Sequence, residues 1–207
     1  MSALAITAIT NFLLACQVFL LAGMLIGSEK TVGSAAWFWS LTILLLGTSA
    51  LLGGIDHGFV EPLGQTRGRV ILERSNWSVL GLMTLCMWMT LARQFFSPQV
   101  QKWILVLAVV QFILFVVLVI TVGQFLVVIV NYAPVMLLFL IMNIIGLKNG
   151  TGSWPMIAGI VIMFIASGLQ ALGVDTFSPL DRNGLYHVVA MVGVVFLYIG
   201  GIKLGVG

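Results

Sequence analysis

Charged residues are what this sequence has least of. Only 7% of its 207 residues are Asp, Glu, Lys or Arg, whereas 61% are hydrophobic. A soluble domain carries charge on about a quarter of its residues, so the composition excludes a soluble protein and indicates an integral, multi-pass membrane protein. The nine basic residues are scattered among the loops and give a net charge of only +3, which excludes a nucleic-acid-binding surface. With two cysteines in the chain, no disulfide framework is expected.

Long apolar runs take up most of the sequence. A helix needs roughly 20 mostly apolar residues to cross a bilayer core of about 30 Å. Seven such segments follow one another, namely Ala3–Ile26, Ala35–Phe59, Trp77–Phe96, Trp103–Val122, Phe125–Leu147, Pro155–Val174 and Gly184–Leu204. They are continuous runs rather than the short alternating strands of a membrane β-barrel. We therefore predict an all-α protein, a single domain of seven transmembrane helices over residues 1–207, in a plasma membrane.

Two residue types mark the ends and the packing of these segments. Tryptophans are favoured between lipid and water, and five of them lie near predicted segment ends: Trp37, Trp39, Trp77, Trp103 and Trp154. Glycines in the stretches LLGG and YIGG indicate positions where two helices pack closely.

The basic residues give only a weak preference for the orientation in the membrane. With seven spans, one side carries Arg67, Arg69, Arg74 and Arg182, and the other carries Lys30, Arg93, Lys102, Lys148 and Lys203. Lys and Arg are enriched in cytoplasmic loops. The second group flanks four separate span ends, which favours a cytoplasmic C-terminus.

The polar residues are sorted to one side of the predicted bundle. His57 ends the second segment and His187 begins the seventh, so both histidines of the chain lie on the N-terminal side. Five of the six acids share that side: Asp56, Glu61, Glu73, Asp175 and Asp181. Polar groups at membrane depth are costly and usually face the bundle interior or a water-filled cavity. We predict a polar pocket that opens on this side and is lined by Asn11, Asn76, Asn131, Tyr132, Gln170 and Asn183.

A structural interpretation of the same residues stays open. Asp56 and the histidines lie near helix ends, where they can cap a helix or form hydrogen bonds in the headgroup region without any chemistry. Asn11, Asn131 and Gln170 can equally be hydrogen-bond partners between helices.

Weak internal repetition suggests a second architectural prediction. The stretch LGTSALLGGIDHGF resembles IASGLQALGVDTFS, and Glu73-Arg74 before the third segment is echoed by Asp181-Arg182 before the seventh. These echoes occur in the same order. They predict two parallel three-helix units joined by the fourth helix, an arrangement in which binding sites lie at the repeat interface.

The seven-segment layout, the stretch TSALLGGIDHGF and the stretch DRNGLYHVV together resemble the CREST superfamily, which includes alkaline ceramidases and adiponectin-receptor-like proteins. The resemblance implies Zn²⁺ bound by one histidine from helix two and two from helix seven, with water activated to cleave a lipid amide. His57 and His187 match two of these ligands, and Ser49 or Asp56 matches the accompanying polar residues. Asn183 stands where the third histidine is expected, so Asp56, Asp175 or Asp181 would have to complete a site with two histidines and one carboxylate.

Two classes of function follow and remain open. In the first, a metal held by His57, His187 and an aspartate activates water to hydrolyse a lipid amide or ester, with Asp56 and Ser49 assisting catalysis. In the second, the protein is no enzyme, and its pocket binds or transports a small solute or a membrane lipid. The repeat favours the second class, and the paired histidines favour the first.

Overall fold

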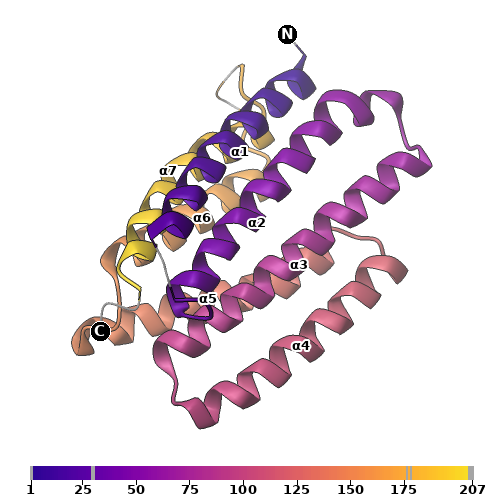
Figure 1. The fold of residues 1–207 in the computed structure, drawn as a ribbon. Helices are drawn as coiled ribbons and strands as arrows, with labels where there is room; N and C mark the ends of the chain where they lie inside the picture. The colour runs from indigo at the N-terminus through magenta and orange to yellow at the C-terminus, as the bar shows by residue number, and fades with distance from the viewer. Residues whose placement is uncertain (1, 29–30, 176, 178, 205–207) are drawn as a thin grey trace.

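The computed structural model describes residues 2–28, 31–175, 177 and 179–204, and within them it is helical, with no β-strand. Seven α-helices follow one another along the chain (Figure 1), as the hydropathy predicts: α1 (Ala3–Ser28), α2 (Ala35–Ile55), α3 (Arg67–Phe95), α4 (Pro98–Thr121), α5 (Leu126–Gly146), α6 (Trp154–Ala171) and α7 (Arg182–Ile202). A π-helical segment, η1 (Asp56–Val60), and a 3₁₀ segment, η2 (Glu61–Leu63), follow α2 directly. The predicted seven-helix membrane bundle is therefore confirmed.

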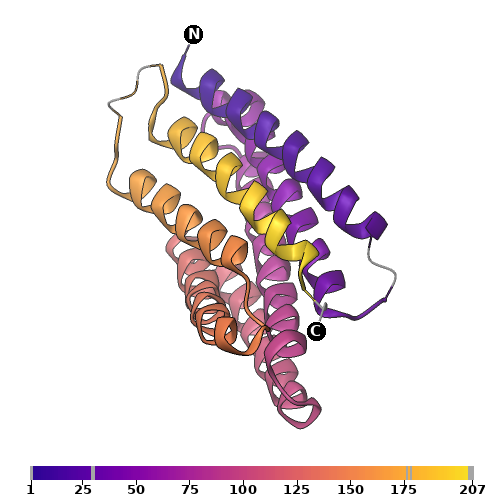
Figure 2. The same ribbon diagram turned by 90° about the vertical axis from the view of Figure 1, so that its left-hand side faces the viewer.

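Six of the helices form a closed ring, and α4 lies outside it. Going round the ring, α1 packs on α2, α2 on α3, α3 on α5, α5 on α6, α6 on α7, and α7 returns to α1. Figure 1 shows α4 beside α3 at the edge of the bundle, and Figure 2 shows α1, α7 and α6 side by side on the opposite flank. The ring thus combines the first three helices with the last three. Whether these two triplets superpose stays a prediction.

The third helix differs most from its predicted span. Six described helices are long and apolar enough to cross a membrane, and α3 is not among them. It begins at Arg67 rather than at the predicted Trp77, because Thr66 caps it by accepting a hydrogen bond from the backbone N–H of Arg69. Its first three turns thus lie before the apolar span and include four charged residues, Arg67, Arg69, Glu73 and Arg74. This extension carries charged residues back along the end of α2.

The interior is held together by large apolar side chains around Trp39. Only 1% of Trp39 is exposed, its indole Nε1 donates to the carbonyl of Leu197 on α7 at 3.1 Å, and its ring packs against Phe139 of α5. The prediction that Trp39 lies between lipid and water is thus wrong, because helix α2 turns this residue toward the ring axis. Trp103 and Trp154, by contrast, are largely exposed, as interfacial tryptophans should be.

Two glycine pairs give the close helix contacts that the sequence indicates. A Cβ on Gly54 of α2 would lie 2.8 Å from the ring of Phe12 on α1. A Cβ on Gly200 of α7 would lie 2.8 Å from the backbone nitrogen of Met156 on α6. Only glycine allows α1 and α2, and likewise α6 and α7, to pack this closely.

A polar network within the bundle fastens α4 to the ring. Gln111 of α4 accepts a hydrogen bond from the Trp88 indole at 2.8 Å and donates to the side-chain oxygen of Asn131 at 2.9 Å. Asn131 in turn donates to Thr84 at 3.1 Å. Asn131 therefore joins α3, α4 and α5 as an interhelical hydrogen-bond partner, which is the structural interpretation that the sequence left open.

Candidate functional site

A charged cluster lies where α2 ends and α3 begins. The chain leaves the α-helical path at Asp56 and makes one π-helical turn through Val60, and such turns occur frequently at functional sites. Gly58 within this turn lies against α1, because a Cβ there would come 3.2 Å from the Ala8 methyl group. The turn therefore positions Asp56, His57 and the following Glu61 against the polar first turns of α3.

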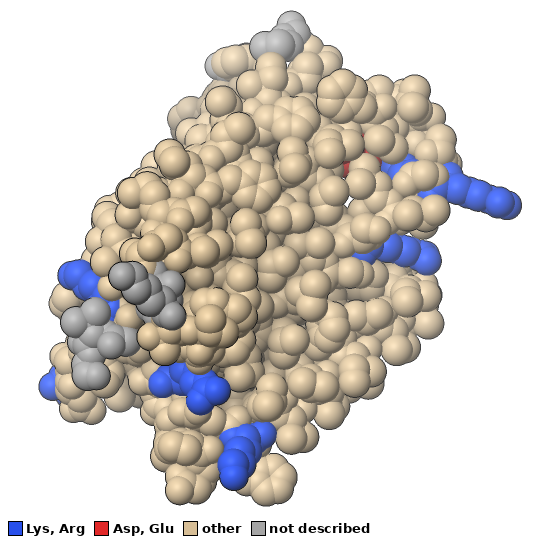
Figure 3. Space-filling view, in the orientation of Figure 1, with Lys and Arg blue, Asp and Glu red and all other residues tan. Residues whose placement is uncertain are grey.

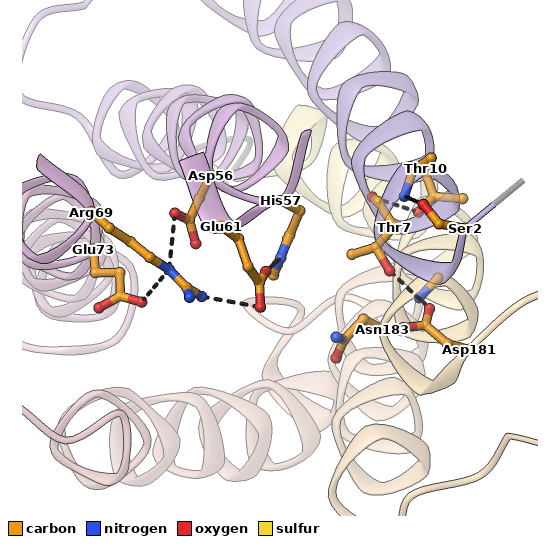
Figure 4. A network of polar contacts seen from close by, with 12 residues as sticks. Ser2, Thr7, Thr10, Asp56, His57, Glu61, Arg69, Glu73, Asp181 and Asn183 are labelled. Carbon is orange, nitrogen blue, oxygen red and sulfur yellow. Dashed lines mark hydrogen bonds and ion pairs between the residues drawn. The ribbon is translucent and has the colours of Figure 1, made fainter. Parts of the chain in front are cut away.

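Arg69 is the centre of this cluster (Figure 4). Its Nε lies 3.4 Å from Oδ1 of Asp56 and 3.2 Å from Oε1 of Glu73, and its Nη2 lies 3.1 Å from Oε1 of Glu61. Glu61 also reaches His57, whose Nδ1 lies 2.5 Å from Oε2. Three carboxylates therefore surround a guanidinium whose side chain is only 14% exposed.

Some polar atoms of the cluster lack a hydrogen-bond partner. The Arg69 Nε is within ion-pair distance of two carboxylates, yet at angles that form no hydrogen bond with either. Oδ1 of Asp56 and Oδ1 of Asn76 are also buried without a donor. An unsatisfied buried polar atom is uncommon in a folded protein and calls for an explanation. These atoms mark the cluster as a place where a further polar group fits.

The cluster opens into a polar pocket of about 270 Å³. Helices α2, α3, α6 and α7 and the start of α5 provide its walls, which comprise Leu52, Gly53, Asp56, His57, Arg69, Leu72, Glu73, Asn76, Trp77, Phe125, Gln170 and Asn183. The Gln170 amide donates to Asn183 at 3.0 Å and links α6 to α7 across one side.

Next to the polar pocket lies a larger cavity inside the helix ring, which we call the inner cavity. It has a volume of about 590 Å³ and a mainly apolar lining from α2, α3, α5, α6 and α7. Trp39, Leu80, Phe164 and Leu197 belong to this lining. Phe125, Gln170 and Asn183 line both spaces, so the polar pocket and the inner cavity are neighbours.

The structure brings together part of the predicted site. Asp56, His57, Asn76, Gln170 and Asn183 line the polar pocket, as expected from their shared side of the membrane. Tyr132 lines the inner cavity instead, with its hydroxyl 3.4 Å from that of Ser167.

Two other predicted residues serve packing. Asn11 packs against Gly53, where a Cβ would lie 3.4 Å from the Asn11 amide atoms, and Ser49 is buried in α2. Neither Asn11 nor Ser49 belongs to the walls of the two cavities. Ser49 stands about two helical turns before Asp56, too far along α2 to share its surroundings.

The predicted metal ligands do not assemble as one set. His187 is buried, and its Nδ1 lies 3.0 Å from the Thr10 hydroxyl of α1. Asp181 caps α7 by accepting from the Gly184 N–H at 2.8 Å and also accepts from Thr7 at 2.9 Å.

The Asp175 carboxylate likewise binds the backbone, since it accepts a hydrogen bond from the Arg182 N–H at 2.6 Å. Among the residues that the structure describes, the one group of three potential ligands with atoms within 4.8 Å of one another is Asp56, His57 and Glu61. The helix-seven residues are absent from it, because capping and α1–α7 hydrogen bonds occupy them.

Arg69, Glu61 and Glu73 belong to the site, although the sequence does not single them out as site residues. In the sequence Arg69 indicates only a loop position that bears on orientation. A signal was present, because positions 69, 73 and 76 follow the spacing of one helical face once Thr66 is taken as the cap. That spacing would have brought Arg69, Glu73 and Asn76 onto the surface that faces α2.

The donor set of Asp56, His57 and Glu61 suits a divalent metal in residue type, since imidazole nitrogens and carboxylate oxygens are both zinc ligands. The arrangement suits it less. Arg69 already lies against the same Asp56 and Glu61 carboxylates, and the 2.5 Å between His57 Nδ1 and Glu61 Oε2 is a hydrogen-bond distance. The Arg69 guanidinium therefore lies where a metal ion would have to bind these carboxylates.

Comparison with known proteins identifies the family. Residues 6–206 match the family described as a family of unknown function (DUF6962), and the chain belongs to it. No curated protein and no solved structure matches the chain.

Proposed function

We propose that the protein binds a single amphiphile, a membrane lipid or a related molecule, with its apolar part in the inner cavity and its polar head in the polar pocket. The observation that supports this most directly is the shared wall of Phe125, Gln170 and Asn183. A volume of about 590 Å³ is typical of small-molecule sites, and such sites combine an apolar lining with a few polar groups.

The rim of the inner cavity supports entry from the bilayer. Phe125 and Ile129 at the start of α5 are 48% and 41% exposed, and Ala171 at the end of α6 is also exposed. All three line the inner cavity. The cavity thus reaches the lipid-facing surface between α5 and α6, near the end of the bundle that holds the polar pocket. A membrane molecule can enter here without crossing the ring.

The lining is suited to a flexible apolar chain. Four methionines contribute to it, Met83, Met87, Met136 and Met163. Methionine side chains are unbranched and adapt to irregular shapes. A cavity of this kind accommodates chains of different length better than a rigid wall of β-branched residues does.

A glycine in the cavity wall provides a direct test. Gly168 lines the inner cavity, and a Cβ placed on it meets no atom within 4 Å, so a larger side chain there enters open space. We expect the purified protein to carry a bound amphiphile in native mass spectrometry and Gly168→Phe to lose it. Gly23 of α1 is the matched control, because it is also unobstructed but does not line the cavity.

The outcome that contradicts the proposal is equal occupancy of the parent protein, Gly168→Phe and Gly23→Phe. Fractionation of the source cells against plasma-membrane markers tests the expected compartment in the same material.

A second candidate is a metal-dependent lipid hydrolase, as the resemblance to the CREST superfamily implies. The grouping of Asp56, His57 and Glu61 favours it. In that reaction water adds to the lipid carbonyl and the amide or ester bond breaks, giving a carboxylic acid and an amine or alcohol. The guanidinium of Arg69 would have to move away from Asp56 and Glu61 to admit the ion.

Metal analysis separates the two candidates. If the hydrolase is correct, the purified protein contains zinc, iron or manganese, and His57→Ala loses both the metal and the cleavage of a lipid amide or ester. His187→Ala should retain both, because His187 contacts Thr10 and lies outside the ligand group. Metal-free protein, unchanged by His57→Ala in a lipid-hydrolysis assay, rules the hydrolase out.

A further inference from the structure

The charge of the polar pocket restricts the head group that it can hold. This step rests on the proposed binding of an amphiphile. Three carboxylates, Asp56, Glu61 and Glu73, surround the single guanidinium of Arg69. If His57 carries a proton, one carboxylate is still in excess, and if it is neutral, two are. Charges taken out of water require compensation, so an anionic head group is disfavoured here.

The unsatisfied atoms indicate which polar partner is missing. Oδ1 of Asp56 and Oδ1 of Asn76 are buried acceptors without a donor, and both residues line the polar pocket. Asp56 is 8% exposed as a whole, so water reaches it poorly. Figure 4 shows the Asp56 carboxylate beside Arg69 in the charged cluster. Asp56 Oδ1 has only the 3.4 Å ion pair with Arg69 Nε, and Asn76 Oδ1 has no donor, so a cationic donor fits this pocket with its excess negative charge.

Aromatic walls add a third indication. Trp77 and Phe125 line the polar pocket, and their ring centroids lie 6.2 Å apart. An ammonium group is attracted to the faces of such rings. Because Phe125 also lines the inner cavity, a head group beside it has an apolar chain path directly behind it.

We infer that the ligand is a long-chain amine, whose protonated amino group lies in the polar pocket and whose chain passes Phe125 into the inner cavity. An ammonium has three donors and no acceptor, which matches the oxygens of Asp56 and Asn76 that lack a hydrogen bond. A hydroxyl supplies a donor but no positive charge. Arg182 lines the inner cavity and not the polar pocket, and its exposed charge is screened by solvent.

The head group is tested by comparing the affinities of three amphiphiles with the same chain: hexadecylamine, hexadecanol and hexadecanoate. We expect native mass spectrometry near neutral pH to show the amine binding about tenfold more tightly than either of the others, since charge-assisted hydrogen bonds are about twice as strong as neutral ones. Asp56→Asn and Glu73→Gln should each reduce the affinity for the amine about tenfold and reduce that for the alcohol much less, because the alcohol gains nothing from the carboxylate's charge beyond a neutral hydrogen bond.

Asp175→Asn is the matched control for these variants. It removes the same charge at the same end of the bundle, but Asp175 does not line the polar pocket, so the affinity for the amine should not change. If Asp56→Asn does not fold, Glu73→Gln decides alone, because the Glu73 side chain is 26% exposed and tolerates the change better.

The results that overturn the inference are distinct from those that overturn the proposed function. If the alcohol or the carboxylate binds as tightly as the amine, the head-group assignment is wrong, while binding that Gly168→Phe abolishes still supports the amphiphile site. If none of the three amphiphiles binds and Gly168→Phe changes nothing, both conclusions fail.

Discussion

The two ends of the helix bundle use their charges in opposite ways. At the end where the chain begins, acidic residues converge on Arg69 and form the wall of a pocket. At the other end, the described basic residues Arg93, Lys102, Lys148 and Lys203 are exposed, and no described acid accompanies them. Figure 3 shows separate Lys and Arg side chains at the lower left of this face without a red acidic side chain beside them, and the one red patch lies near the blue side chains at the opposite end. At the first end the charged side chains around Arg69 line an internal pocket, whereas the described charged side chains at the other end are all exposed.

The comparison also shows why counting basic residues gives little information on orientation. Arg69 contributes to the count of the first end, although its charge is used inside the protein. Once it is set aside, the sequence leaves three basic residues for that end, Arg67, Arg74 and Arg182, against five for the other. The enrichment of basic residues on the cytoplasmic side then favours a cytoplasmic C-terminus more clearly.

Replacing Arg69 should give the largest effect and would sharpen the comparison most. Arg69→Met leaves Asp56, Glu61 and Glu73 without their shared counter-ion in a partly buried site. Breaking a buried ion pair by removing one partner costs about 3–5 kcal/mol. We expect a large fall in the free energy of unfolding, measured by denaturation in detergent.

Arg93→Met is the control at the opposite end. Arg93 is exposed and donates to the side chain of Gln101, and exposed substitutions of this kind usually change stability by about 0.5 kcal/mol or less. Equal destabilisation by Arg69→Met and Arg93→Met would show that the ion pairs of Arg69 stabilise the protein no more than an exposed residue does. The contrast between the two ends of the bundle would then fail.

A smaller difference is expected between helix caps at the two ends. Asp181 caps α7 and also accepts a hydrogen bond from Thr7 of α1, whereas Ser34 at the other end caps α2 by accepting from the Trp37 N–H at 3.0 Å. Losing a cap costs about 1 kcal/mol. Asp181→Ala should therefore cost more than Ser34→Ala, by about the value of one further hydrogen bond.

Thr7→Val tests the reason for this difference. It removes the bond to Asp181 but leaves the α7 cap intact, so its cost should account for the excess of Asp181→Ala over Ser34→Ala. If Thr7→Val is neutral while the excess persists, the α1–α7 bond is not its cause.

The sequence predicts the fold well because the membrane imposes a simple rule. Apolar runs of sufficient length must be helices in lipid, and the ends of α1, α5 and α7 follow from hydropathy to within two residues. The start of α3 does not follow, since charged residues interrupt the apolar pattern of its first turns and Thr66 caps them. The buried position of Trp39 does not follow either, because hydropathy does not report which face of a helix points inward.

The site was predictable only in part. The common side of the polar residues follows from counting spans, which is why Asp56, His57, Asn76, Gln170 and Asn183 were found. Which of them meet depends on how the helices are arranged around the ring. His187 and His57 have similar depth, yet His187 contacts Thr10 while His57 contacts Glu61. The depth of a residue in the membrane follows from its position along a helix. Its contacts depend on how the helices pack, which a single sequence does not reveal.

The smallest effect on stability is expected at the end with the exposed lysines. Substitutions there test the orientation in the membrane without changing the folding. Changing Lys102, Lys148 and Lys203 together to Gln should alter the free energy of unfolding little, because all three are exposed. The same change leaves that end with fewer basic residues than the end with Arg67, Arg74 and Arg182. A reporter fused to the C-terminus should be cytoplasmic in the parent protein and appear partly on the opposite side in the triple variant. If the parent reporter lies outside, the charges of this end do not set the topology, and the contrast between the two ends concerns the pocket alone.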